Sequence, residues 1–179
     1  MVTVADPVMY ESYWQKMGNM CDITFSGYQS LSYFANAKYL CWFLEPKREE
    51  EIKKLHNVFG NAVMDDHYVV VGTGSSQLIQ AALYALSPTD EPEPISVVSA
   101  APFYPEVTDF VRSGLYKWAG VARNFEKDGP YIKFITSLNN PYGFTREIVV
   151  NGVQGTLIHD FAYYWPQYTA ITSPATNMY

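Results

Sequence analysis

The sequence predicts an α/β fold with a mostly parallel sheet and flanking helices. Short β-branched runs of strand length alternate with longer segments whose apolar residues recur at helical spacing. The strand candidates are apolar along most of their length, which is typical of strands covered on both faces. With 179 residues, the chain is long enough to enclose one hydrophobic core. These observations together favour a layered α/β domain.

The first expected elements are helical. Residues 1–45 form an aromatic-rich N-terminal segment in which a short helix is expected around Trp14. An amphipathic helix is expected over residues 46–59, because its apolar positions follow an i, i+3, i+6, i+7 stripe. Gly60 then ends this helix.

The remaining elements alternate between strand and helix. The β-branched run Tyr68–Val71 predicts a buried strand, and Ser75 or Ser76 can cap a helix that runs to Leu86. Further elements are expected as strands over residues 95–98, 115–118, 131–136 and 155–159, a helix over 104–110, and a frayed end over 171–179.

Composition and charge narrow the partners and the compartment. The net charge of −6 argues against a nucleic-acid backbone, and no apolar stretch approaches the roughly 20 residues needed to span a membrane. Cys21 and Cys41 lack metal-ligand spacing and form no disulfide framework, so neither a metal site nor an oxidising compartment is indicated. With no signal-peptide pattern and no glycosylation sequon, a cytoplasmic location is expected.

Polar groups follow the predicted strands at their carboxyl ends, where ligands bind in open α/β sheets. Residues 72–77, Gly-Thr-Gly-Ser-Ser-Gln, can offer backbone and hydroxyl donors to a phosphate at a helix N-terminus. The spacing does not match a P-loop. It does not match a dinucleotide-binding turn either, because Gln77 stands where the third glycine would be. An ordinary strand-to-helix turn explains this stretch equally well.

Two further groups point to a planar cofactor. Asn140 lies in a turn after residues 131–136, and Asp160 ends an apolar run, with Tyr163 three residues beyond. A buried carboxylate needs a cationic partner such as a protonated pyridine nitrogen, while Tyr163 and Asn140 can reach a phenolic oxygen on the same ring. Pyridine, phenolic oxygen and phosphate together describe pyridoxal 5′-phosphate (PLP). Each residue also fits a structural role as turn, satisfied carboxylate or core aromatic.

Several motifs carry a family resemblance across nearly the whole chain. They include Val71-Gly-Thr-Gly-Ser-Ser-Gln-Leu78, Ala101-Pro-Phe-Tyr104, Asn139-Asn-Pro141 and His159-Asp-Phe-Ala-Tyr-Tyr-Trp-Pro166. With these motifs the chain resembles the plant alliinase and tryptophan aminotransferase-related family. The stretches 6–10, 40–46 and 112–118 look nearer the tryptophan aminotransferases.

The resemblance implies a homodimeric, PLP-dependent enzyme of fold type I, in which residues 46–179 form an incomplete PLP-binding large domain. It implies that Asp160 pairs with the pyridinium nitrogen and keeps the ring an electron sink. The other contacts that it implies are Tyr163 and Asn140 at the phenolic oxygen, Tyr104 stacked on the ring, Ser75, Ser76 and Gln77 at the phosphate, and Tyr33 at the phosphate of the partner subunit's cofactor.

Two departures from the family pattern bear on activity. Leu138 and Tyr142 replace residues of the usual Ser-Pro-Asn-Asn-Pro-Asp/Glu-Gly loop, although Asn140 is retained. The family's Schiff-base lysine lies a few tens of residues beyond Asp160, and the 179 residues include neither that lysine nor the small C-terminal domain. The chain is therefore expected to be a truncated N-terminal part of the enzyme that is inactive by itself.

The expected activity of the complete enzyme is transamination between an amino acid and a 2-oxo acid. L-Tryptophan and pyruvate are the favoured pair, giving indole-3-pyruvate for auxin biosynthesis. An alliinase-type C–S lyase and a non-catalytic remnant of a truncated gene are the alternatives. An unrelated nucleotide-binding domain is a third, against which the missing third glycine and the pair Asp160 and Tyr163 argue.

Overall fold

The computed structural model describes residues 10–22, 24, 44, 46–104, 114–126, 129–138, 143 and 155–175. The chain divides into two compact units, Met1–Leu40 and Cys41–Tyr179. The first unit contains helix α1 (Glu11–Met17) and the 3-10 turn η2 (Gly18–Cys21). This confirms the short helix expected around Trp14. The domain boundary proposed at residues 45 and 46 stays a prediction.

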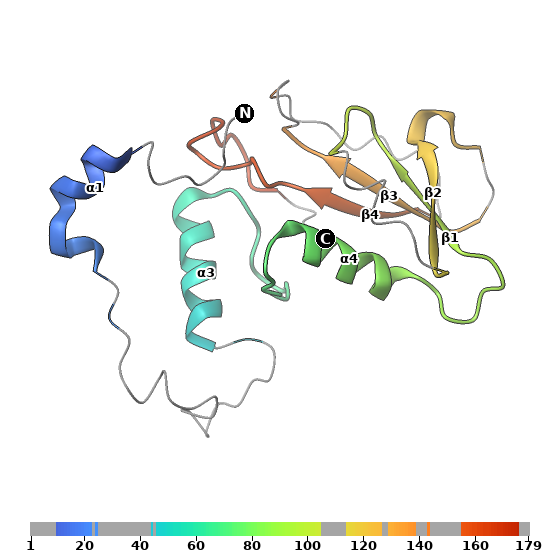
Figure 1. Ribbon diagram of the computed structural model, residues 1–179, viewed down its shortest axis with the longest axis horizontal. Coiled ribbons are helices and arrows are strands. Elements are labelled where there is room, and N and C mark those ends of the chain that lie inside the picture. Colours follow the sequence, from blue (N-terminus) through green and yellow to red (C-terminus); the bar gives the residue numbers. More distant parts are fainter. Residues whose placement is uncertain are drawn as a thin grey trace. The chain divides into compact units, whose positions relative to one another are not determined.

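A four-stranded sheet forms the centre of the second unit (Figure 1). Its members are β1 (Ile95–Ser99), β2 (Tyr116–Val121), β3 (Tyr131–Thr136) and β4 (Gly155–Asp160), in the order β2-β1-β3-β4. Every neighbouring pair is parallel. The predicted α/β class with a parallel sheet is confirmed, and β1, β3 and β4 match their predicted bounds to within one residue. The strand predicted over 115–118 begins one residue later and extends to Val121. A 3-10 turn, η4 (Ala122–Asn124), follows β2.

Helix α4 (Ser75–Leu86) covers one face of this sheet. Ile79 and Leu83 of the helix join one apolar cluster with the sheet residues Ile95, Val97, Tyr116, Ile132, Phe134 and Ile158. A short loop leads from the end of α4 to the start of β1, so the helix runs antiparallel to the strands. Its first turn therefore lies at the end of the sheet to which the arrowheads of β3 and β4 point in Figure 1.

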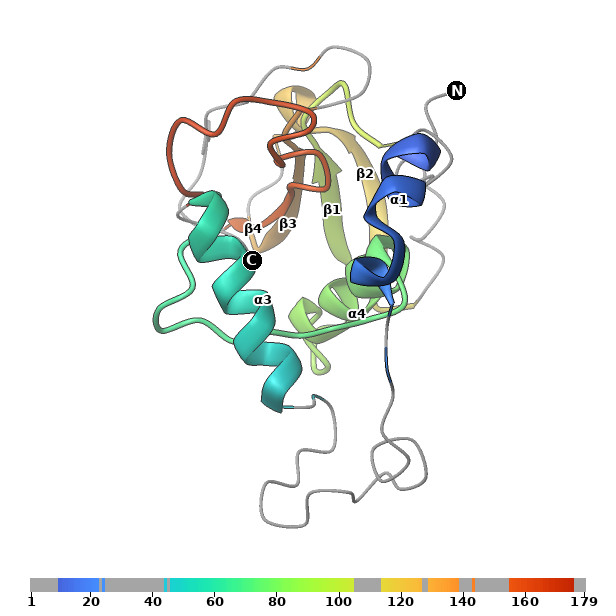
Figure 2. The same cartoon turned by 90° about the vertical axis from the view of Figure 1, so that its left-hand side faces the viewer.

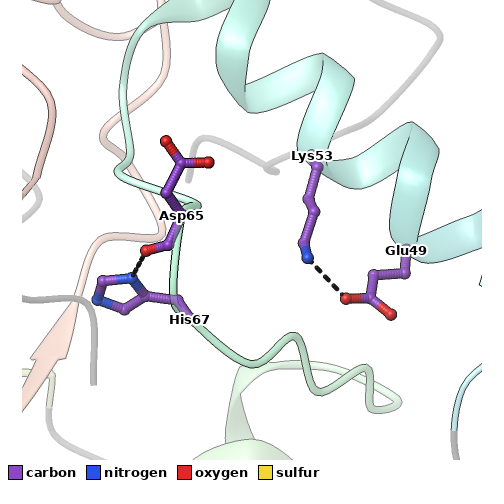
Figure 3. A network of polar contacts seen from close by, with 4 residues as sticks. All are labelled: Glu49, Lys53, Asp65 and His67. Atoms are coloured by element: carbon purple, nitrogen blue, oxygen red, sulfur yellow. Dashed lines mark hydrogen bonds and ion pairs between the residues drawn. The ribbon is translucent and has the colours of Figure 1, made fainter.

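Helix α3 (Pro46–Phe59) confirms the amphipathic helix predicted for this stretch. Gly60, with a φ of 65°, ends it and donates its N–H to the His56 carbonyl at 2.8 Å. On the helix, Lys53 Nζ lies 2.8 Å from Glu49 Oε1 (Figure 3). Among the residues that the structure describes, none of the helices combines the length and apolar character needed to cross a bilayer.

The run Tyr68–Val71 is not a strand, so this prediction is wrong. Tyr68 is 99% exposed and Val70 67% exposed, and no strand pairs with this run in the part of the chain that the structure describes. Just before it, the His67 ring donates from Nδ1 to the Asp65 carbonyl at 2.6 Å (Figure 3). High β propensity reflects packing on a half-buried pleated surface, and an exposed run has no such surface.

Residues 171–175 are not a frayed end, which corrects a second prediction. Ala175 forms a parallel bridge with Ala62, and its N–H donates to the Asn61 carbonyl at 3.0 Å. The Tyr164 hydroxyl donates to the Ser173 carbonyl at 2.6 Å. Isolated tertiary hydrogen bonds thus order a stretch that has no helix or strand period. The helix predicted over 104–110 lies outside the described residues except for Tyr104.

Candidate functional site

The carboxyl edge of the sheet brings Tyr104 and Asp160 together around Thr136. Asp160 is the last residue of β4 and is in register with Thr136, the last residue of β3. Beyond the two strands, the Ser137 N–H donates to the Asp160 carbonyl at 3.0 Å. The Tyr104 N–H lies 3.4 Å from Thr136 Oγ1. Two of the predicted cofactor-binding residues therefore flank one position at this edge.

The environment of the Asp160 carboxyl group fits a cationic ligand. Oδ1 accepts the Ala162 N–H at 3.0 Å. Burial raises the pKa of this carboxyl, and the hydrogen bond from Ala162 acts in the opposite direction. Since burial penalises the charged carboxylate, a cation placed against it recovers part of that cost. The protonated nitrogen of a pyridine ring meets this requirement.

The first turn of α4 carries the predicted phosphate contacts Ser75, Ser76 and Gln77. Gly74 is the N-cap of the helix with a φ of 115°, and no side chain caps it. The prediction that Ser75 or Ser76 caps the helix is therefore wrong, because both serines already lie inside its first turn. A helix leaves its first N–H groups without intrahelical acceptors, so this turn presents donors at the carboxyl edge of the sheet.

The residues after Asp160 are anchored to α3, which holds Tyr163 close to the end of β4. Tyr164 is buried, and its carbonyl accepts the Asn61 side chain at 3.0 Å. The Trp165 ring lies 5.0 Å from His56 and 5.6 Å from Phe59, centroid to centroid. Figures 1 and 2 show this segment beside the C-terminal end of α3.

Tyr163 differs from its neighbour Tyr164 in both exposure and contacts. It is only half-buried, and its ring meets Tyr168 edge to face at 5.2 Å. The turn that carries it is closed by the Tyr164 N–H, which donates to the Phe161 carbonyl at 2.8 Å. The anchored neighbours thus fix the backbone of Tyr163, while its own side chain stays at the surface of the unit.

Two titratable residues, Lys133 and His159, face the opposite side of the sheet. Lys133 precedes Thr136 by three residues and His159 precedes Asp160 by one, so the alternation of side chains along a strand separates the two sets. Lys133 is buried, and burial lowers its pKa. A sequence that reads Tyr-Ile-Lys-Phe-Ile-Thr signals a buried strand, and only the register shows which way its lysine points.

The place of His159 in an apolar strand predicts a packed, hydrogen-bonded ring, and the structure confirms the packing but not the hydrogen bonds. Neither ring nitrogen has a hydrogen-bond partner in the described structure, and both are buried. The ring stacks on Phe161 at 5.3 Å with an interplanar angle of 10°. Burial, and then the charge of Lys133, lowers the pKa of His159. The neutral imidazole is therefore the favoured form, and the residue belongs to the interior rather than to the Asp160 edge.

The remaining predicted contacts, Tyr33 and Asn140, lie outside the described residues and stay predictions. The departure at Leu138 is described: the side chain is buried and its φ is 59°. Proline cannot adopt this angle, because its ring holds φ near −65°. The chain that leads to Asn140 therefore leaves β3 with a backbone that the family's usual Ser-Pro sequence does not permit.

Comparison with known proteins places this site in a family. The family model described as "Allinase" matches residues 1–178. The chain belongs to the allinase family. The match covers the turn before α4, the sheet and the segment after Asp160, so every predicted cofactor contact lies within it.

Relatives of this allinase-family chain include both aminotransferase-related proteins and lyases. It is 59% identical to "Tryptophan aminotransferase-related protein 2" of Arabidopsis thaliana over 96% of the chain and 40% of that relative. It is 52% identical to "Tryptophan aminotransferase-related protein 1" of Oryza sativa subsp. japonica, with the same shares covered. "Alliin lyase 1" of Allium sativum is 38% identical over 95% of the chain and 36% of the relative. The chain thus spans 36–40% of the length of these relatives.

Proposed function

We propose that the protein carrying this chain is a PLP-dependent aminotransferase, and that residues 10–175 hold much of its cofactor site. The observation that carries the proposal is the half-buried carboxyl of Asp160 at the carboxyl edge of a parallel sheet, where partial burial raises its pKa. The chain is 59% and 52% identical to two tryptophan aminotransferase-related proteins and 38% identical to an alliin lyase, whereas tryptophan aminotransferase-related proteins 3 and 4 of Arabidopsis thaliana are 35% and 34% identical. The higher identity to the first two proteins favours L-tryptophan as the amino donor and pyruvate as the acceptor over C–S bond cleavage.

Each predicted contact has a defined task toward the cofactor. When bound, PLP supplies an electron sink for the bonds at the substrate Cα. Asp160 would hold the ring nitrogen in its protonated form by ionic pairing. The first turn of α4, with Ser75 and Ser76, would bind the phosphate, and Tyr104 would cover the ring. Tyr163 and Asn140 would orient the ring through its phenolic oxygen, and Tyr33 would act across a homodimer interface.

The placement of the described lysines supports the proposal that the lysine that binds PLP covalently lies outside these 179 residues. Lys133 is the buried lysine of the sheet, and it faces away from Thr136 and Asp160. Lys53, Lys54 and Lys117 form ion pairs with glutamates on exposed surfaces. We propose that residues 1–179 alone hold PLP without a covalent bond and do not catalyse transamination, and that the lysine for covalent attachment comes from a later segment.

The test uses both the 179-residue polypeptide and the complete protein encoded by the source transcript. PLP is titrated into the polypeptide and followed by tryptophan fluorescence, while the complete protein is assayed with L-tryptophan and pyruvate for indole-3-pyruvate. Borohydride reduction and peptide mapping locate the PLP-bearing lysine. We expect saturable binding to the polypeptide, activity only in the complete protein, and labelling beyond residue 179.

Three results would contradict the proposal in different ways. Pyruvate release from an S-alkyl cysteine sulfoxide, without transamination, would establish the lyase alternative. PLP fixed to a lysine within residues 1–179 of an active protein would show that the catalytic arrangement is wrong. Absence of PLP from both proteins would leave a non-catalytic member of the family.

A further inference from the structure

We propose that Gln77 is a positioning residue that holds the turn of residues 72–74 in shape for an anion, without binding that anion itself. The proposal rests on the proposed PLP site and sharpens the role of one residue in it. Gln77 was expected to contact the phosphate directly. The hydrogen bonds of its side chain instead point back into the turn.

The side-chain oxygen of Gln77 accepts two hydrogen bonds, both from Thr73. Oε1 accepts the Thr73 N–H at 2.6 Å and the Thr73 hydroxyl at 2.9 Å. An amide oxygen has two acceptor positions, so these bonds use its capacity. Gln77 is the third residue of α4, and a glutamine at this position commonly reaches back to the N-cap N–H. Here it reaches one residue further, to Thr73, and so ties the preceding loop to the helix.

Gly72 gives the second sign that this contact shapes the turn. A Cβ at this position would lie 2.8 Å from Gln77 Oε1 and 2.8 Å from Leu78 Cδ2. A larger residue would push the ends of these two side chains away from their present places, so glycine allows the close contact between the loop backbone and Gln77. Gly74, with its φ of 115°, then redirects the chain into the helix. The two glycines and Gln77 therefore form one unit, in which the loop backbone is ordered before a ligand arrives.

Gln77 is uncharged, and this points to an anion as the ligand of the turn before α4. A glutamate could accept the same two bonds, and helix N-termini favour acidic residues. Within the described residues, α1 and α3 follow that preference, with Glu11 in the first turn of α1 and Glu49 in that of α3. The first turn of α4 contains no acidic residue. A carboxylate at position 77 would repel a phosphate bound at the same helix end, whereas an amide holds the turn without that penalty.

The experiment compares Gln77→Met, Gln77→Glu and Thr73→Val in the 179-residue polypeptide, with the exposed Gln80→Met of the same helix as a matched control. Two quantities are measured for each variant. Amide hydrogen exchange of Thr73, followed by NMR without ligand, reports the turn. Affinity for PLP, and separately for inorganic phosphate, reports the anion site.

The expected pattern separates positioning from direct contact. Gln77→Met should release the Thr73 amide to exchange and weaken PLP binding about five-fold, equivalent to about 1 kcal/mol, as one or two exposed hydrogen bonds would. Gln77→Glu should keep the amide protected yet weaken PLP and phosphate binding at least as much. Adding Thr73→Val to Gln77→Met should cause no further loss, because both changes remove the same contact.

Two results would overturn the proposal. Additive losses of affinity in the double variant would show that Gln77 meets the phosphate itself. Equally fast Thr73 exchange in the unchanged chain and in Gln77→Met would show that the contact does not hold the turn. If Thr73 is protected but the unchanged chain binds neither PLP nor phosphate, the proposed function fails, and the anion role of Gln77 fails with it.

Discussion

Replacing Asp160 by asparagine tests the cofactor site, because it should weaken PLP binding and yet stabilise the ligand-free chain. Asparagine keeps the size of the side chain and an oxygen that can accept the Ala162 N–H, but it removes the charge. Removing one partner of a buried ion pair costs about 3–5 kcal/mol, and the half-buried position of Asp160 favours the low end. A loss of about 3 kcal/mol corresponds to a PLP affinity roughly 150-fold weaker.

The same substitution should stabilise the ligand-free chain at neutral pH. Burial raises the pKa of Asp160 above its unfolded value, so the stability linked to this group is fully present below the unfolded pKa. That stability is lost as the pH rises through the folded pKa, and Asp160→Asn avoids the loss. The variant should therefore be more stable than the unchanged chain at pH 7, with the difference vanishing as the pH falls toward about 4.

Two titrations measure these effects: urea unfolding between pH 4 and 7, and PLP binding followed by tryptophan fluorescence. Asp90→Asn is the control, because it removes the same charge from an exposed loop far along the chain from the site. It should change neither quantity appreciably. PLP affinities of Asp160→Asn and the unchanged chain that agree within two-fold would refute the pairing of Asp160 with the pyridine nitrogen.

Three further predictions concern the core, a buried histidine and an exposed run. Leu83→Ala removes a side chain with 0% exposure and should lower the free energy of unfolding in urea by about 3 kcal/mol. Tyr84, which is 68% exposed, is the control, and Tyr84→Ala should lower it by about 0.5 kcal/mol or less. Equal losses would show that the face of α4 that packs on the sheet has been assigned wrongly. Burial lowers the pKa of His159, so the stability linked to this group is fully present above about pH 6.5 and is lost as the pH falls through the folded pKa. His159→Phe should therefore flatten the decline of unfolding free energy between pH 7 and 5. An unchanged pH profile would argue against a buried neutral ring. Val70→Lys should reduce self-association measured by sedimentation equilibrium, because an exposed β-branched run can pair with another chain. Unaltered association would show that another surface mediates it.

Local sequence patterns were sufficient to predict a helix that makes its own hydrogen bonds or a strand in a buried sheet. The bounds of α3 match the expected helix because its apolar stripe and Gly60 act within one segment. The same holds for β3, whose run of apolar residues marks a strand covered on both faces. The carboxylate of Asp160 was also recognisable, since a charged residue that ends an apolar run stands out without any knowledge of its neighbours.

The Ser75 or Ser76 cap was misplaced locally by one or two residues, whereas two other errors arose where the outcome depends on a distant partner. Tyr68–Val71 has the same β-branched character as β1, yet β1 lies between two strands and Tyr68–Val71 lies exposed. The order of residues 171–175 comes from Asn61 and Ala62, more than a hundred positions earlier. No local period reports such contacts, because each is a single hydrogen bond or bridge between segments.

The sequence alone determined the α/β class, the family resemblance and the residue types able to meet PLP, because propensity, apolar period and motif spacing are properties of neighbouring residues. The tertiary structure alone decided which of those residues share an edge. The register of β3 and β4 sets Thr136 beside Asp160 and turns Lys133 and His159 to the other face. The packing of α4 brings its first turn to the carboxyl ends of the strands. Register and packing follow from long-range burial and pairing, and these contacts form only when the whole unit folds.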